Sequence, residues 1–144
     1  MNLLSWMYVS KSLVAAEREE DVLHDIVGLS RQRNAGLDVT GCLILARGRF
    51  AQILEGPADA VAELRMSIEA DSRHTDVITV DLSQTRMRRF SGWSLAYAGP
   101  SVFVEKAMAD TIWDVAAANE RNAVGRLVQM MEGLAAASTN SGHH

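Results

Sequence analysis

Residues 39–56 read VTGCLILARGRFAQILEG, two apolar runs around a short polar step. Residues 39–46 are rich in apolar side chains, as is typical of a buried strand, and residues 50–55 form a second such run. The Arg47-Gly48 pair between them is a turn signal. The stretch therefore predicts two antiparallel strands that are joined as a β-hairpin.

A helix is predicted on each side of this hairpin in the sequence. Residues 19–21 are all acidic, which suits the positive end of a helix dipole, and the helix that follows is expected to end with Gly36 at the C′ position. Pro57 suits the first position of the second helix, where a missing N–H costs nothing. The apolar stripes are Leu23, Ile26 and Val27 in the first helix and Val61, Leu64 and Ile68 in the second.

Three further strands complete the predicted sheet. They are residues 3–10, 77–82 and 93–97, each of them short and rich in apolar, aromatic or β-branched side chains. The resulting order is strand, helix, strand, strand, helix, strand, strand. This order predicts an α+β sandwich in which two helices cover one face of the sheet.

The pattern becomes helical after residue 100. Ser101 is expected to cap a helix that runs to Ala118, and a second helix carries an apolar stripe at helical spacing: Val124, Leu127, Val128, Met131 and Leu134. We expect these helices, residues 101–137, to cover the second face of the sheet, which would otherwise be exposed. Residues 1–100 then form the domain proper, and residues 138–144 a disordered tail or the remnant of a tag.

Composition and charge exclude several classes of protein. The 144 residues include 14 Lys and Arg against 18 Asp and Glu, a net charge of −4, so no nucleic-acid partner is expected. Cys42 is the only cysteine, which excludes a disulfide framework and suits a reducing, cytoplasmic setting. No membrane-spanning run and no signal peptide are expected. The histidines and carboxylates lack metal-ligand spacing, so no metal is predicted.

Four polar side chains fall on otherwise apolar faces. Helical spacing turns Ser30 and Asn34 to the side of the first helix's stripe, and strand alternation places Tyr8 and Gln52 among apolar neighbours. An unpaired buried polar group costs about 1–3 kcal/mol, so the cluster suggests a polar, planar ligand between helices and sheet. Simpler interpretations stay open: Tyr8 as a core ring, Gln52 on a half-exposed strand, and Asn34 as a helix-end residue.

Several short motifs occur in an order that resembles one known family. They are Met7-Tyr8-Val9-Ser10, Ser30-Arg31-Gln32-Arg33-Asn34, Thr40-Gly41, Phe50-Ala51-Gln52-Ile53-Leu54-Glu55-Gly56, Asp71-Ser72-Arg73-His74 and Arg88-Arg89-Phe90-Ser91-Gly92-Trp93. Each motif is weak alone, but together, over about residues 3–98, they resemble the BLUF family, sensors of blue light using flavin. The resemblance implies a ferredoxin-like fold, in agreement with the predicted order of elements.

The resemblance also implies a flavin, FAD or alternatively FMN, between the two helices. Tyr8 and Gln52 fall on the family's photoactive pair, and Asn34 on the residue that anchors the pyrimidine edge of the flavin. The flavin-binding set that the resemblance implies is Tyr8, Ile26, Ser30, Arg33, Asn34, Phe50, Gln52, Asp71, Arg73 and His74. Arg33 stands where the family often has Asn or His, and a guanidinium there can meet ribityl or phosphate oxygens.

Light sensing in this family implies a rearrangement of hydrogen bonds around Tyr8 and Gln52. Tyrosine can donate an electron and then its proton to an excited flavin, and a glutamine amide, which donates and accepts, can bridge the phenol and the flavin. Rotation or tautomerisation of the amide would give a small, reversible red shift. Trp93 and Leu95 on the last strand are expected to couple this change to the rest of the protein, although Leu95 replaces the family's usual Met.

The sequence thus predicts a blue-light photoreceptor that is not an enzyme and carries no fused catalytic domain. Output is expected through a separate protein partner or through self-association, as a homodimer formed by the sheet or the C-terminal helices. Two alternatives stay open on the residues alone. One is a flavin-free, ferredoxin-like regulatory binding module, and the other is a small enzyme, such as a flavin-dependent oxidoreductase or an acylphosphatase-like hydrolase.

Overall fold

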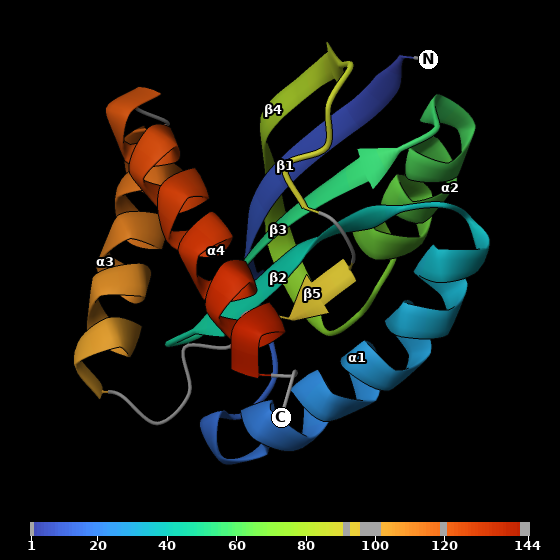
Figure 1. The fold of residues 1–144 in the computed structure, drawn as a ribbon. Coiled ribbons are helices and arrows are strands. Elements are labelled where there is room, and N and C mark those ends of the chain that lie inside the picture. Colours follow the sequence, from blue (N-terminus) through green and yellow to red (C-terminus); the bar gives the residue numbers. More distant parts are fainter. Residues whose placement is uncertain (1, 91–92, 96–101, 119–120, 142–144) are drawn as a thin grey trace.

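A five-stranded sheet forms the middle layer of the protein, with helices on both of its faces (Figure 1). The computed structural model describes residues 2–90, 93–95, 102–118 and 121–141. The elements in chain order are β1 (Leu3–Ser12), the 3-10 turn η1 (Ala16–Arg18), α1 (Glu19–Gly36), β2 (Thr40–Ala46), β3 (Arg49–Gly56), α2 (Ala58–Glu69), β4 (His74–Thr85), β5 (Trp93–Leu95), α3 (Val102–Ala118) and α4 (Arg121–Ser141). The predicted order of strands and helices is confirmed.

The strands are arranged in the order β4-β1-β3-β2-β5. All neighbouring pairs are antiparallel except β2 and β5, which run parallel. β1 and β3 therefore lie inside the sheet, and most of their residues are buried. Their register places Tyr8 directly opposite Gln52. Because side chains of an opposed pair project from the same face, these two polar groups meet in the middle of the sheet.

Several predicted boundaries were wrong. β4 covers twelve residues rather than 77–82, because the long partner strand β1 supplies pairing out to His74 at one end and Thr85 at the other. Pro57 is the N-cap of α2 and not its first helical residue. Gly36 is still helical, and the left-handed turn falls on Asp38, with φ of 57°, an acidic side chain that tolerates this conformation.

The two faces of the sheet carry different cores. On one face, α1 and α2 cover Trp6, Tyr8, Leu43, Phe50 and Leu54. On the other face, α3 and α4 cover the alternate residues of the same strands, such as Met7, Ile44 and Ile53, with Ile112, Leu127 and Met131. We call α3 and α4 the helical cap. The C-terminal helices therefore cover the second face of the sheet, as the sequence predicted.

The end of the helical cap differs from the prediction. α4 continues to Ser141, past Ser138, where the disordered tail was expected to begin. Four of its five predicted stripe residues are buried or half-buried, and the side chain of the fifth, Leu134, lies outside the described part. Ser101, the expected cap of α3, also lies outside it.

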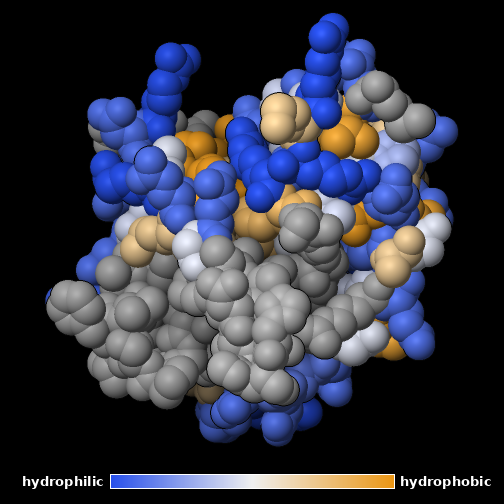
Figure 2. Space-filling model, viewed as in Figure 1, coloured by the Kyte–Doolittle hydropathy of each residue, from blue (hydrophilic) through white to orange (hydrophobic). Residues whose placement is uncertain are grey.

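The outer surface is that of an ordinary globular domain. On the face drawn in Figure 2, hydrophilic side chains surround smaller apolar areas. No helix in the described ranges is long and apolar enough to cross a membrane.

Gly41 provides a test of the β2–β3 pairing. A Cβ atom at this position would collide with the backbone oxygen of Ile53, which cannot move without breaking the hairpin. Gly41→Ala is therefore expected to lower the free energy of unfolding by about 3 kcal/mol or more, measured by urea denaturation. The control is Gly125→Ala in α4, where no atom stands within 4 Å and a gain of about 0.5–1 kcal/mol is expected. Equal stability of the two variants would contradict the close approach.

Candidate functional site

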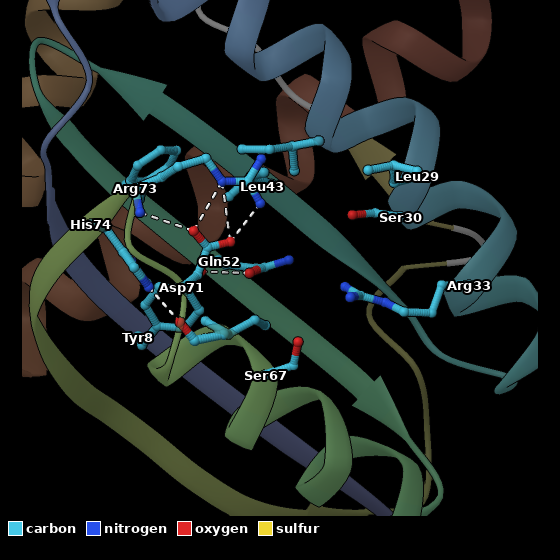
Figure 3. A pocket seen from close by; sticks show the side chains of 13 residues that line it. Tyr8, Leu29, Ser30, Arg33, Leu43, Gln52, Ser67, Asp71, Arg73 and His74 are labelled. Atoms are coloured by element: carbon cyan, nitrogen blue, oxygen red, sulfur yellow. Dashed lines mark hydrogen bonds and ion pairs between the residues drawn. The ribbon is translucent and has the colours of Figure 1, made fainter.

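A pocket opens between α1 and α2, above the middle of the sheet (Figure 3). It is a partly open hollow with about 630 Å³ of empty space, which includes solvent at its mouth. Its lining residues are Tyr8, Ile26, Leu29, Ser30, Arg33, Leu43, Phe50, Gln52, Ser67, Ile68, Asp71, Arg73 and His74. Nine of the ten residues that the sequence analysis expected around a flavin belong to this set, and Asn34 does not.

The floor of the pocket is a hydrogen bond between two buried side chains. The Tyr8 hydroxyl donates to Oε1 of Gln52 over 2.6 Å, and both residues are at most 6% exposed. Burial, reinforced by the negative charge of Asp71, raises the pKa of Tyr8, so the phenol keeps its proton at any physiological pH. With Oε1 facing the phenol, the NH₂ group of the same amide faces away from it, into the pocket (Figure 3).

Trp6 lies behind Tyr8 rather than in the pocket. The two ring centroids are 4.7 Å apart, and the indole N–H donates to the Thr79 hydroxyl over 3.0 Å. Trp6 is fully buried, so its polar atom needs and has an internal partner. It is a core aromatic that fixes the ring of Tyr8 from one side.

Asp71 and Arg73 form one wall of the pocket. Nε of Arg73 and the backbone N–H of the same residue both donate to Oδ1 of Asp71 over 2.9 Å. The hydrogen bonds from Arg73 hold the pKa of Asp71 below its usual range. The carboxylate and the guanidinium satisfy one another, so this wall presents a pair with no net charge to a bound molecule.

His74 uses both of its ring nitrogens inside the protein. Nε2 lies 2.6 Å from the backbone oxygen of Ile68, and Nδ1 lies 2.7 Å from the Ser10 hydroxyl. A carbonyl oxygen can only accept, so Nε2 carries the proton, and in the neutral ring Nδ1 accepts from Ser10. The ring packs edge-on against Tyr8 and Phe50, with 5.9 Å between centroids in each case. His74 therefore presents ring carbons to the pocket.

Asn34 and Ser30 both point inward from α1, as helical spacing predicted. Ser30 lines the pocket and is 6% exposed. Asn34 is 1% exposed, and its Oδ1 atom has no hydrogen-bond partner in the described part of the chain. An unpaired buried amide oxygen costs about 1–3 kcal/mol, so Asn34 is more than a helix-end residue. Its position calls for a ligand that can donate an N–H.

Four lining residues were missed by the sequence analysis. Leu43 is the register partner of Gln52 on β2, so strand pairing could have identified it. Leu29 lies four residues before Arg33 on α1, so helical spacing could have identified it as well. Ser67 and Ile68 lie one after the other near the end of α2. Ser67 carries no sequence signal that separates it from a surface serine.

Comparison with known proteins identifies the family. Residues 3–96 match the family described as BLUF, sensors of blue-light using FAD. The chain belongs to the BLUF family. A photoactivated adenylate cyclase subunit beta from Euglena longa is 37% identical over 97 residues, which are 67% of this chain but only 11% of the cyclase. The chain thus spans about a ninth of the length of that BLUF relative.

Solved BLUF structures have the same fold. The dark-state structure of the BLUF protein BlrB is 31% identical, has a TM-score of 0.74, and is matched over 92% of this chain and 96% of its own. The Klebsiella pneumoniae protein BlrP1, solved with FMN and cyclic diGMP, is 30% identical with a TM-score of 0.58 over 65% of this chain and 24% of its own. The first match includes both the BLUF sheet and the region of the helical cap.

The described residues of this BLUF chain fit a flavin. BLUF domains bind flavin, and a flavin is planar, with an N–H and two carbonyl groups on one edge. The pocket between α1 and α2 offers the inward NH₂ group of Gln52, and Asn34, one turn along α1 from the lining residue Ser30, adds a buried acceptor without a partner in the described part of the chain. These are the acceptor and the donor that such an edge requires.

Removal of the Asn34 amide tests its place in the flavin site. Asn34→Ala is expected to weaken flavin binding by about 1–3 kcal/mol, because the N–H of the flavin would lose its buried acceptor. Binding is measured by titration of the flavin-free protein with fluorescence detection. His24→Ala, an exposed position on the same helix, is the matched control. Equal affinities for the two variants would place the flavin edge elsewhere.

Proposed function

We propose that this BLUF chain is a blue-light photoreceptor in which Tyr8 and Gln52 form the photoactive pair. The observation that carries the proposal is the buried hydrogen bond from the Tyr8 hydroxyl to Oε1 of Gln52 at the floor of the pocket. The bond places the Tyr8 hydroxyl proton and the Gln52 amide where the sheet would meet a bound flavin ring. The family match favours this function over a flavin-free regulatory module and over a small enzyme.

The chemistry of the pair follows from what each group can donate. When bound, the flavin supplies absorption of blue light and an electron acceptor. Tyr8 supplies an electron and its hydroxyl proton, and its raised pKa keeps that proton in place in the dark. Oε1 of Gln52 accepts the hydrogen bond from the Tyr8 hydroxyl. Rotation or tautomerisation of the Gln52 amide exchanges its donor and acceptor ends. Such an exchange changes the hydrogen bonds in the pocket and leaves no net chemical product.

The remaining lining residues have positioning roles in the proposal. Ile26 and Phe50 provide apolar contact for the ring, and Ser30 provides a hydroxyl beside it. Arg33 is exposed at the pocket and has room to meet ribityl or phosphate oxygens, whereas Arg73 is occupied by Asp71. We propose FAD as the flavin, in line with the family's description, with FMN as the alternative.

β5 is the proposed route of output. In the described part of the chain it pairs with β2, where Leu95 stands opposite Leu43, a residue that lines the pocket. The side chains of Trp93 and Leu95 lie outside the described part, so their coupling role stays a proposal. We further propose a cytoplasmic location and output through a separate protein partner or as a homodimer. Light scattering in the dark and under blue light tests the homodimer.

Two variants separate the roles of the photoactive pair. Wild type is expected to show a small red shift under blue light that reverses in the dark. Tyr8→Phe and Gln52→Leu are expected to retain flavin but lose the shift, because one lacks the transferable proton and the other the bridging amide. The measurement is the absorption spectrum before and after illumination. Gln129→Leu makes the same amide-to-alkyl change at an exposed position of α4 and is expected to behave as wild type.

A normal photocycle in either pocket variant would sink the proposed mechanism. A purified wild-type protein that takes up no flavin would sink the proposed function as a whole.

A further inference from the structure

Glu55 is a buried carboxylate on the opposite face of the strand that carries Gln52. It is fully buried, and its burial raises its pKa. Its Oε1 atom accepts the backbone N–H of Arg89 over 2.8 Å and that of Phe90 over 3.2 Å. The Glu55 carboxylate thus accepts hydrogen bonds from the backbone N–H groups of two consecutive residues, Arg89 and Phe90.

Arg88, the residue before Arg89, forms hydrogen bonds at the same end of the sheet. Its Nη1 atom donates to the Thr40 hydroxyl and to the backbone oxygen of Glu55, both over 2.9 Å. Its Nη2 atom donates to the backbone oxygen of Asp38 over 2.9 Å and pairs with the carboxylate of that residue at 3.2 Å. We call these contacts of Glu55 and Arg88 the connection clamp.

The topology explains why a clamp is needed here. β4 and β5 lie at opposite edges of the sheet, so the chain between them must cross the ends of β1, β3 and β2 (Figure 1). Backbone donors on such a crossing have no strand partner, and unpaired buried donors are costly. Within the described residues, β5 pairs with β2 through Trp93, Ser94 and Leu95. Its position therefore depends on where the crossing is held.

One oxygen of the Glu55 carboxylate, Oε2, has no hydrogen-bond partner in the described part of the chain, and neither does the Ser5 hydroxyl. Ser5 is the register partner of Glu55 on β1, so their side chains project from the same face. A second arrangement would follow from rotation of the Glu55 carboxyl group, in which one oxygen accepts the Ser5 hydroxyl and Oε1 turns away from a backbone N–H of the crossing.

We propose that Glu55 and Arg88 are positioning residues of the light response: they hold the chain before β5 on the end of β3, and the exchange of a backbone N–H for the Ser5 hydroxyl releases it. The proposal rests on the proposed function, because the light response of this chain is itself a proposal. The strand that carries Gln52 on its pocket face carries the clamp on its cap face, three residues later.

The test compares Glu55→Gln with Glu132→Gln, the same change at an exposed position of α4. A neutral acceptor binds an N–H about half as strongly as a carboxylate, so the amides of Arg89 and Phe90 are expected to exchange hydrogen about tenfold faster in Glu55→Gln. Flavin content and the size of the red shift are expected to match the control, while the light-minus-dark infrared difference in the amide I region becomes smaller.

Two further variants test the other residues of the clamp proposal. Arg88→Lys keeps the charge but lacks the two-nitrogen fork that serves Glu55 and Asp38 together, so it is expected to change hydrogen exchange and the amide I signal in the same direction. Ser5→Ala removes the partner of the second arrangement. It is expected to leave the dark exchange rates unchanged and to reduce the amide I change on illumination.

The outcomes separate the clamp from the proposed function. Glu55→Gln with exchange rates and amide I changes equal to those of Glu132→Gln would overturn the clamp, whatever the red shift does. A wild type without a red shift would overturn the proposed function and with it the role of the clamp in a light response. The dark exchange rates of Arg89 and Phe90 would then still decide whether Glu55 holds the crossing.

Discussion

The hydrogen bond between Tyr8 and Gln52 depends on one constraint, the register of β1 against β3. These two strands are central and buried, so a slip by one residue would turn every apolar side chain to the wrong face. The pairing is therefore fixed by the whole core. It places the hydroxyl 2.6 Å from the amide oxygen without any contribution from a flexible loop. Light-sensing chemistry based on a single exchangeable hydrogen bond requires this kind of rigid support.

The same alternation divides the protein into a ligand side and a cap side. Along β3, Gln52 and Leu54 face α1 and α2, whereas Ile53 and Glu55 face the helical cap. Side chains on the two faces do not meet through the sheet. In our proposal, communication between pocket and cap passes along backbones, with β5 joined to β2 by three described residue pairs.

The polar side chains of the pocket wall are satisfied by the protein, whereas the buried amide oxygen of Asn34, outside the lining, has no partner in the described part of the chain. Asp71 pairs with Arg73, and His74 bonds to Ser10 and to the Ile68 backbone. Asn34 keeps an unpaired acceptor, and the NH₂ group of Gln52 points into the space. The protein thus fixes the shape of the pocket internally and reserves one acceptor and one donor for its ligand. This division also explains why His74, a titratable residue beside Tyr8, presents only carbon atoms to the pocket.

The sequence by itself determined the order of elements, the hairpin, the two-faced sheet and the inward direction of Ser30 and Asn34, because hydrophobic periodicity and helical spacing are local properties. Motif order was enough to indicate the family. Only the tertiary structure decided that β4 extends to His74, that the indole of Trp6 is behind Tyr8, and that His74 is occupied on both nitrogens. It alone decided the partners of Glu55, a charged residue in a strand that accepts hydrogen bonds from residues 33 to 35 positions later. Contacts of that separation depend on how the chain crosses the sheet, and no local pattern records the crossing.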